Sequence, residues 1–324
     1  MKVIGQSRSI LEAQEKAKKV ASGTTPVLLL GENGTGKELF AQMIHDLSPR
    51  KAGPFVPINI AAIPKDIQES ELFGYELGVS AAKIRRRIGK LELATKGTVY
   101  VDKVTSMDLG LQTKFIQFLE WESFRRIGGR RPVKVDIRVV AATNTDLKEA
   151  VAQQAFLENL YYRLNVFPIV LPPLRNRSED IPLLVEHFLT MCSRELNKEG
   201  LKVSSEALEV MMNYPWPGNI DEIQSCIERA VVFCDGKTIT SQNLDLHFPE
   251  TKPAASTVKI SLQARSLHEA THAAVRAVEV QMIERVLKET GWNKSKAAEK
   301  LKVSYKTLLT KIKEYGLEEQ DGIS

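Results

Sequence analysis

The residues with the most specific chemistry form one glycine-rich segment, Gly31-Glu32-Asn33-Gly34-Thr35-Gly36-Lys37-Glu38. It follows the apolar run Val27–Leu30 and precedes the mostly apolar residues 39–44, so the pattern predicts a strand, a turn and a helix. Glycines allow successive backbone N–H groups to turn toward phosphate oxygens at a helix N-terminus, and the Lys37 ammonium adds a positive charge. We therefore expect this segment to bind the phosphates of a nucleotide such as ATP or ADP.

A second predicted strand, residues 98–102, ends in the carboxylate of Asp102. An aspartate after such a strand is typical of a magnesium ligand beside nucleotide phosphates. The next residue usually polarises the attacking water, a task that requires a hydrogen-bond acceptor. Here it is Lys103, whose ammonium is a donor only. The two segments together predict a site that binds a nucleotide but does not hydrolyse it.

Further segments resemble those of one protein family and occur in the same order. They are Glu69-Ser70-Glu71-Leu72-Phe73-Gly74, Ala141-Ala142-Thr143-Asn144, Leu160-Tyr161-Tyr162-Arg163-Leu164-Asn165-Val166 and Trp216-Pro217-Gly218-Asn219. Over nearly its whole length the chain resembles the bacterial enhancer-binding proteins, the sigma-54-dependent transcription activators. The resemblance implies a AAA+ domain in which Asn144 and Arg163 act with the glycine-rich segment at the nucleotide. It also implies a homo-oligomer, a dimer or a ring, that works with RNA polymerase.

The chain departs from this family at positions that matter for the family's activity. The loop that contacts sigma-54 corresponds to residues 78–83, which lack the aromatic tip and the glycine hinge. Leu157 occupies the place of a first arginine finger, and an apolar side chain cannot stabilise charge in a transition state. Asp221 occupies the place of an arginine that senses the nucleotide, so the sign of the charge is reversed.

The loss of an arginine finger lowers hydrolysis rates by roughly 10³- to 10⁵-fold. With Lys103, Leu157 and Asp221 all altered, we expect no catalytic residues, and a DNA-binding regulator that acts without the sigma-54 form of RNA polymerase. The alternative is a working ATPase that remodels sigma-54 polymerase with substituted residues. Because some members of the family bind a cyclic dinucleotide at or beside the nucleotide site, cyclic-di-GMP is an alternative ligand to ATP or ADP.

The length of 324 residues suggests two or three domains. Alternating strand and helix patterns up to residue 165 predict an α/β domain with a parallel sheet. We expect the AAA+ subdomain at 1–170, an α-helical lid at 171–248, a linker at 249–266 and an all-α domain of the Fis type at 267–324. The lid is predicted to contain three helices, at 178–196, 204–214 and 219–233.

The end of the chain predicts a helix-turn-helix that follows a helix at 273–289. Asn293 and Ser304 are suited to cap its two helices, which run to Lys300 and to about Tyr315. The side chains expected to face inward are Ala297, Ala298, Leu301, Val303, Leu308 and Ile312. Those expected to contact double-stranded DNA are Lys294, Lys296, Ser304, Tyr305, Lys306, Thr307, Thr310 and Lys311.

The distribution of charge agrees with this prediction. The chain has a formal net charge of +5, and residues 291–317 alone hold seven lysines against two glutamates, also a net of +5. The remainder of the chain is therefore neutral. A basic patch confined to a helix-turn-helix is typical of phosphate binding.

Other patterns in the sequence have simpler interpretations. A basic cluster of Lys83 and residues 85–87 is interpreted as a solvated loop, with binding of an anionic ligand or a neighbouring subunit as the alternative. The motif at 268–272 resembles that of zinc proteases, but we find no third ligand, which a catalytic zinc needs. No membrane span or signal peptide is evident, so we expect a cytoplasmic protein. Free thiols are expected for Cys192, Cys226 and Cys234.

Overall fold

The computed structural model describes residues 3–77, 86–198, 200–246 and 290–317, together with 276, 279–280, 282–284 and 286–287. The chain divides into two compact units, Met1–Phe248 and Pro249–Ser324. Within the described residues, no helix is long and apolar enough to cross a bilayer. The altered contact loop at 78–83, the linker and the motif at 268–272 lie outside the described residues.

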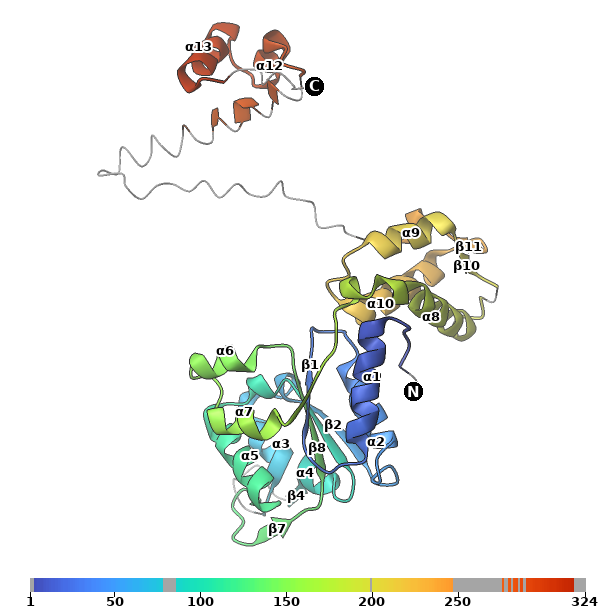
Figure 1. Ribbon diagram of the computed structural model, residues 1–324, viewed down its shortest axis with the longest axis vertical. Helices are drawn as coiled ribbons and strands as arrows, with labels where there is room; N and C mark the ends of the chain where they lie inside the picture. The colour runs from blue at the N-terminus through green and yellow to red at the C-terminus, as the bar shows by residue number, and fades with distance from the viewer. Residues whose placement is uncertain are drawn as a thin grey trace, which may run out of the picture. The chain divides into compact units, whose positions relative to one another are not determined.

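A five-stranded parallel sheet forms the centre of the larger unit (Figure 1). Its order is β2 (Phe55–Asn59), β5 (Thr98–Asp102), β8 (Arg138–Thr143), β1 (Val27–Leu30) and β9 (Phe167–Val170). The register aligns Leu30 with Thr143, and Asn59 with Asp102. Because the strands are parallel and in register, their carboxyl ends lie at one edge of the sheet. The loops that follow β1, β5 and β8 are therefore neighbours.

Helices cover both faces of this sheet (Figure 1). On one face lie α1 (Arg8–Ala21) and α2 (Lys37–Asp46), and on the other α3 (Lys65–Phe73), α4 (Lys90–Leu93), α5 (Leu109–Trp121), α6 (Leu147–Ala152) and α7 (Glu158–Leu164). Successive strand residues alternate between two apolar clusters: Val99 and Val101 pack with α3 and α5, whereas Tyr100 packs with α1 and α2. Burial on both faces explains why the three central strands, β1, β5 and β8, are nearly continuous apolar runs.

Short elements complete this part of the unit. Two antiparallel hairpins pair β3 (Gly74–Tyr75) with β4 (Arg87–Ile88) and β6 (Ser123–Arg125) with β7 (Pro132–Lys134). Single 3-10 turns, η1 (Ile60–Ala62) and η2 (Val104–Ser106), follow β2 and β5.

A helical lid follows the sheet and has its own apolar core. Its helices are α8 (Ile181–Glu195), α9 (Ser205–Asn213) and α10 (Asn219–Phe233), and its smaller elements are η3 (Leu174–Asn176), η4 (Ser178–Asp180), β10 (Lys202–Val203), β11 (Thr238–Ile239) and η5 (Ser241–Asn243). All three predicted helices are present, and all three cysteines are free and buried in this core.

The first lid helix begins three residues later than its pattern suggests. Ser178–Asp180 forms the separate turn η4, and the Asp180 carboxylate does not cap α8. Instead it accepts hydrogen bonds from Gln6 N at 2.6 Å, Ser7 N at 2.8 Å and Ser7 Oγ at 2.6 Å. This buried carboxylate therefore ties the segment before α1 to the lid.

The second unit contains the predicted helix-turn-helix, α12 (Lys294–Lys300) and α13 (Tyr305–Tyr315). The Asn293 side chain accepts from Lys296 N at 3.1 Å, and Ser304 Oγ accepts from Thr307 N at 3.0 Å, so both predicted caps are confirmed. Its core consists of Ile283, Val286, Leu287, Ala297, Ala298, Leu308, Ile312 and Leu317.

One expected core residue of this unit is not buried. Val303 is 40% exposed, so the prediction that it faces inward is wrong. Lys302 adopts a left-handed conformation (φ 55°), and Val303 N donates to Ala298 O at 3.1 Å. This tight turn directs the Val303 side chain outward. Of the preceding predicted helix, residues 273–275, 277–278, 281, 285 and 288–289 lie outside the described residues.

Candidate functional site

The glycine-rich segment connects β1 to α2, as the pattern predicts. Gly34 and Gly36 have φ values of 73° and 94°, a region that favours glycine, and Gly36 directly precedes the first residue of α2. Among the described residues, none accepts a hydrogen bond from the backbone N–H of Asn33, Gly34 or Gly36. Free donors at the N-terminus of a helix fit phosphate oxygens.

Lys37 is the buried cation of this loop. It is 6% exposed, and its Nζ donates to Gly31 O at 2.9 Å and to Glu32 O at 2.7 Å. Burial lowers the pKa of Lys37, Asp102 raises it, and Lys103 lowers it further. Two ammonium groups and a carboxylate therefore act on one another at this edge of the sheet.

Lys103 points into the site. It follows β5 in a left-handed conformation (φ 56°), and its backbone N donates to Asp102 Oδ1 at 2.8 Å. Its Nζ donates to Asn144 Oδ1 at 3.0 Å and also to Asn33 Oδ1. Lys103, which stands in the place of the water-polarising acid, thus binds the phosphate loop and Asn144. Asn144 directly follows β8 and was also predicted to act at the nucleotide.

Two carboxylates near the phosphate loop are suited to hold magnesium. Burial raises the pKa of the Tyr100 hydroxyl, and the charges of Asp102 and Glu38 raise it further, so both carboxylates lie close to that hydroxyl. With phosphate oxygens they would provide the hard oxygen ligands that magnesium prefers. Within the described part of the chain, no group of three or more His, Cys, Asp or Glu side chains is arranged to hold a metal ion.

The lid holds the phosphate loop through contacts that the sequence did not reveal. Asn219 Nδ2 donates to Asn33 O at 2.9 Å, and Ile220 N donates to Gly34 O at 2.9 Å. The Arg175 guanidinium donates to both carboxylate oxygens of Glu32, at 2.8 and 2.6 Å, and lowers the pKa of Glu32 to about 2. Each of these contacts joins residues more than 140 positions apart, so local spacing contains no signal of them.

Asp221 also faces this loop. A Cβ added to Gly34 would lie 3.3 Å from the Asp221 carboxyl carbon. Burial raises the pKa of Asp221, and Lys37 lowers it. The structure therefore places a carboxylate beside the phosphate loop at the position where the family carries an arginine.

The remaining two predicted positions lie at the N-cap of α7 and within α7. Leu157 precedes the helix, its N donates to Gln112 Oε1 at 2.8 Å, and its side chain packs against the core. Arg163 is exposed, and its guanidinium pairs with Glu120 of α5. Its partner is thus an acidic residue of its own chain, and neither residue contacts the phosphate loop in the described part of the chain.

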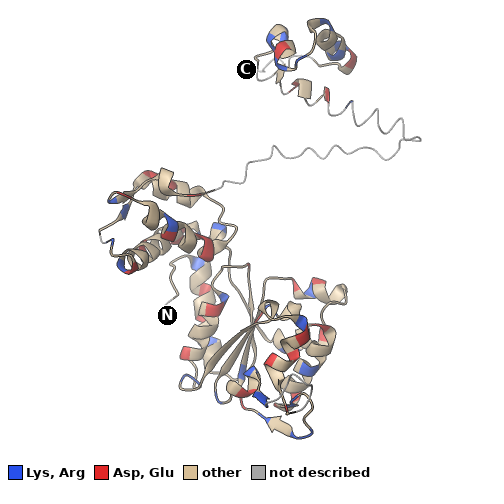
Figure 2. Cartoon of the chain, turned by 180° about the vertical axis from the view of Figure 1, so that it is seen from behind, with Lys and Arg blue, Asp and Glu red and all other residues tan. Residues whose placement is uncertain are grey.

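The predicted DNA-contacting residues belong to α12, to α13 and to the N-cap of α13, and Figure 2 marks the lysines of these helices in blue. Seven of them are exposed: Lys294, Lys296, Ser304, Tyr305, Lys306, Thr307 and Thr310. Lys311 differs because its Nζ bonds to Glu279 and lies 3.5 Å from Tyr315 Oη. Glu279 and Tyr315 were not recognised in the sequence, although Glu279 lies in the predicted preceding helix.

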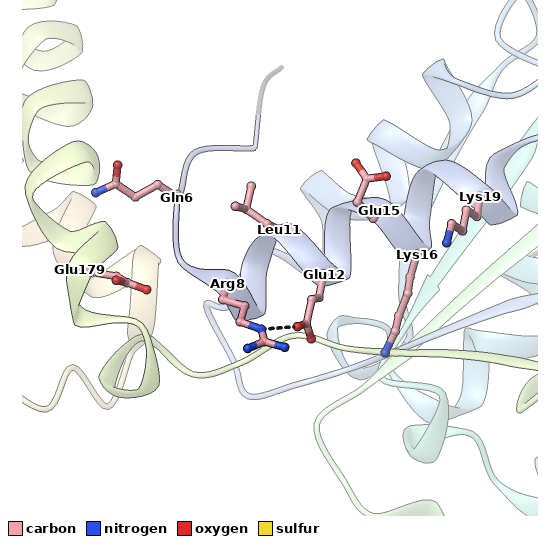
Figure 3. A pocket seen from close by; sticks show the side chains of 8 residues that line it. All are labelled: Gln6, Arg8, Leu11, Glu12, Glu15, Lys16, Lys19 and Glu179. Atoms are coloured by element: carbon pink, nitrogen blue, oxygen red, sulfur yellow. Dashed lines mark hydrogen bonds and ion pairs between the residues drawn. The ribbon is translucent and has the colours of Figure 1, made fainter.

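A shallow hollow of about 690 Å³ lies along α1 (Figure 3). Opposite charges alternate around it, and Arg8 Nε pairs with Glu12 at 2.8 Å. It contains no convergent set of donors like that of the phosphate loop. The side chains that line it are Gln6, Arg8, Leu11, Glu12, Glu15, Lys16, Lys19 and Glu179.

Comparisons with known proteins agree with this arrangement. Residues 3–170 match the Sigma-54 interaction domain, residues 175–260 the AAA+ ATPase lid domain, and residues 274–315 the Fis family of bacterial regulatory proteins. In the solved structures, the chain resembles NtrX from Brucella abortus in complex with ATP, with a TM-score of 0.70 and 30% identity over 98% of this chain and 70% of that one.

Two curated relatives show the same likeness in sequence. The chain is 39% identical to the nitrogen fixation protein AnfA of Azotobacter vinelandii over 97% of this chain and 57% of AnfA. It is 39% identical to the regulatory protein AtoC of Escherichia coli over 98% of this chain and 68% of AtoC. It spans 44% of a third relative, the formate hydrogenlyase transcriptional activator FhlA of Escherichia coli. Since the match to the Sigma-54 interaction domain alone covers more than half of its residues, the chain belongs to the sigma-54-dependent transcription activators, the bacterial enhancer-binding proteins.

Proposed function

We propose that this protein is a DNA-binding transcription regulator whose AAA+ domain binds a nucleotide without hydrolysing it, and that it acts without sigma-54. The observation that carries the proposal is the position of Lys103. Its ammonium lies at the phosphate loop, bonded to Asn33 and Asn144, where hydrolysis needs an acceptor for a water proton. An ammonium cannot perform that task.

Two further substitutions support the absence of hydrolysis. The Leu157 side chain is apolar and packs against the core, so it offers no charge to the nucleotide of a neighbouring subunit. Asp221 presents a carboxylate to the loop, where it would repel the charge that develops on the phosphates. An arginine finger alone accounts for roughly 10³- to 10⁵-fold in rate, so turnover should be close to background.

The test is a steady-state ATPase measurement on the full chain with magnesium. The Lys37→Ala variant supplies the background, since it lacks the cation of the phosphate loop. We expect equal rates for the parent and this variant. A parent rate well above that of Lys37→Ala would overturn the proposal.

The alternative function is an active ATPase that remodels sigma-54 RNA polymerase at enhancer-dependent promoters. The match of residues 3–170 to the Sigma-54 interaction domain favours it, as do the retained Asp102, Asn144 and Arg163. Transcription in vitro on DNA selected by the protein separates the two functions. Regulation only of polymerase that carries sigma-54, together with ATP turnover, would establish the alternative.

The proposed ligand is ATP or ADP, with magnesium held by Asp102. In support, the solved NtrX structures include complexes with ATP and with ADP. Cyclic-di-GMP is the alternative ligand, and one titration series with the three nucleotides distinguishes them. We further propose a homo-oligomer, a dimer or a ring, bound to double-stranded DNA in the cytoplasm.

A further inference from the structure

We infer that Lys103 is a direct ligand of the outermost phosphate and supplies there much of the positive charge that magnesium provides in related sites. The inference deepens the proposed nucleotide-binding function and rests on it. It concerns Lys103 itself, because hydrogen bonds within this chain place the Lys103 ammonium in the site.

The first observation is how Lys103 is held. Its Nζ bonds to Asn33 in the loop after β1 and to Asn144 after β8, while Lys103 itself follows β5. β5 pairs with β8, and β8 pairs with β1, so three adjacent strand ends meet at this ammonium. A lysine with a long, flexible stem is thereby fixed over the edge of the sheet where the phosphate loop lies.

The second observation is the donor count of the ammonium. It has three N–H donors, and two of them are directed to amide oxygens of Asn33 and Asn144. Amide oxygens orient the group without cancelling its charge, as a carboxylate would. The third donor remains for a phosphate oxygen, and a hydrogen bond between ions is stronger than one between neutral groups.

The third observation is the proximity of a second cation. The Lys37 ammonium donates to Glu32 O, and the Lys103 ammonium donates to Asn33 Oδ1, so adjacent residues of the phosphate loop hold the two cations. Two cations beside free backbone N–H donors form a site that an anion stabilises. Replacing a carboxylate by an ammonium also changes the charge at this position by +2, which equals the charge of one magnesium ion.

Asp221 opposes this effect from the lid side. Its carboxylate lies beside Gly34, whereas Lys103 is bonded at the strand ends. The inference therefore places the added positive charge at the outer phosphate, and the added negative charge near the turn of the loop. ATP and ADP differ only in that outer phosphate, which makes their comparison informative.

The experiment is isothermal titration calorimetry of the full chain with ATP and with ADP, in magnesium and in excess EDTA. For the parent we expect ATP affinity to fall by less than about tenfold in EDTA. In Lys103→Met, which keeps most of the length of the side chain and removes its charge, we expect ATP affinity in EDTA to fall by a further 10- to 100-fold, about the effect of one charge-assisted hydrogen bond. ADP affinity should change much less.

Two variants control this comparison. Lys148→Met alters an exposed lysine of α6 and should leave all four titrations unchanged. Lys103→Arg keeps the charge and should retain ATP binding in EDTA, which also tests the idea if Lys103→Met proves unstable.

The outcomes are separable. An absolute magnesium requirement in the parent would overturn the inference, and so would equal losses of ATP and ADP in Lys103→Met. Either result would leave a non-hydrolysing nucleotide site intact. No binding of any nucleotide under either condition would instead overturn the proposed function.

Discussion

The three altered residues of the nucleotide site are held by separate contacts. Lys103 is bonded to Asn33 and Asn144, Leu157 packs against the core, and Asp221 lies beside the phosphate loop. None of these contacts includes another of the three. Reversal of one substitution therefore leaves the other two in place.

Lys103→Glu alone should not restore ATP hydrolysis. It returns an acceptor to the end of β5, but Leu157 and Asp221 still leave the transition-state charge without support. The steady-state rate should equal that of Lys37→Ala. Rapid turnover in the single variant would show that Lys103 is the sole defect.

Asp221→Asn should stabilise the protein slightly at neutral pH, because Asp221 is an exposed residue whose carboxyl group is only partly desolvated. Burial raises the pKa of Asp221, so the charged form is the one that the folded state disfavours. The stability associated with this group is present below its ordinary pKa of 3.8 and is lost as the pH rises through the raised value. The variant should have a higher Tm than the parent near pH 7, with a difference that disappears toward pH 3.8.

The same variant should bind ATP about tenfold more tightly, because it removes one negative charge near the phosphates. Glu179→Gln provides the control, since Glu179 is an exposed acid on η4. If Asp221→Asn leaves both the Tm and the ATP affinity unchanged, the Asp221 carboxylate of the parent does not act on the phosphate loop.

At the scale of elements, the turn η4 and the segment before α1 depend on one carboxylate. Asp180 is fully buried and accepts three hydrogen bonds from Gln6 and Ser7. Asp180→Ala should lower the free energy of unfolding by about 3 to 5 kcal/mol, because it leaves these donors without their acceptor and removes the negative charge that acts on the buried Arg177. Urea denaturation measures the loss. Glu179→Ala, at the exposed neighbouring position in Figure 3, should cost less than about 0.5 kcal/mol.

The exposed face of α13 should determine DNA affinity. Lys306→Ala should weaken binding and reduce the slope of log K against log salt by about one unit if Lys306 neutralises one phosphate. Lys311→Ala should have a smaller effect on the slope, because Lys311 is paired with Glu279. Fluorescence anisotropy over a range of salt concentrations gives both values, with Lys148→Ala as a control outside the second unit. An unchanged slope in Lys306→Ala would remove it from the interface.

The sequence predicted elements better than contacts. The strand, loop and helix around Gly31–Lys37, the three lid helices and the caps of Asn293 and Ser304 depend on local spacing, which a sequence displays directly. The hydrogen bond from Lys103 to Asn144 and the hydrogen bond from Asn219 to the phosphate loop depend on which loops the folded chain brings together. Such contacts join distant residues, so a local pattern contains no trace of them.

At the scale of the whole molecule, each unit has a core made of its own residues. Among the described residues, the core of the second unit is built from residues between Val280 and Leu317, and the clusters of the larger unit end at Leu246. Differential scanning calorimetry of the full chain should therefore show at least two transitions. ATP at 100 times its Kd should stabilise the larger unit by about 2.7 kcal/mol and leave the second unit unchanged. An equal shift of all transitions would indicate coupled unfolding.

The close approach of Gly34 and Gly218 has a mechanical consequence. A Cβ on Gly34 would lie 2.1 Å from Gly218 O, and Ile220 N bonds to Gly34 O, so loop and lid meet backbone to backbone. A tilt of the Gly34 peptide must therefore displace the first turn of α10. With 15 residues, this helix is about 22 Å long and acts as a lever arm. A pivot of about 5° moves the far end by about 2 Å, at Phe233, whose ring is exposed. A movement of the phosphate loop can thus be transmitted to the surface of the lid through the backbone, without a charged side chain that senses the nucleotide.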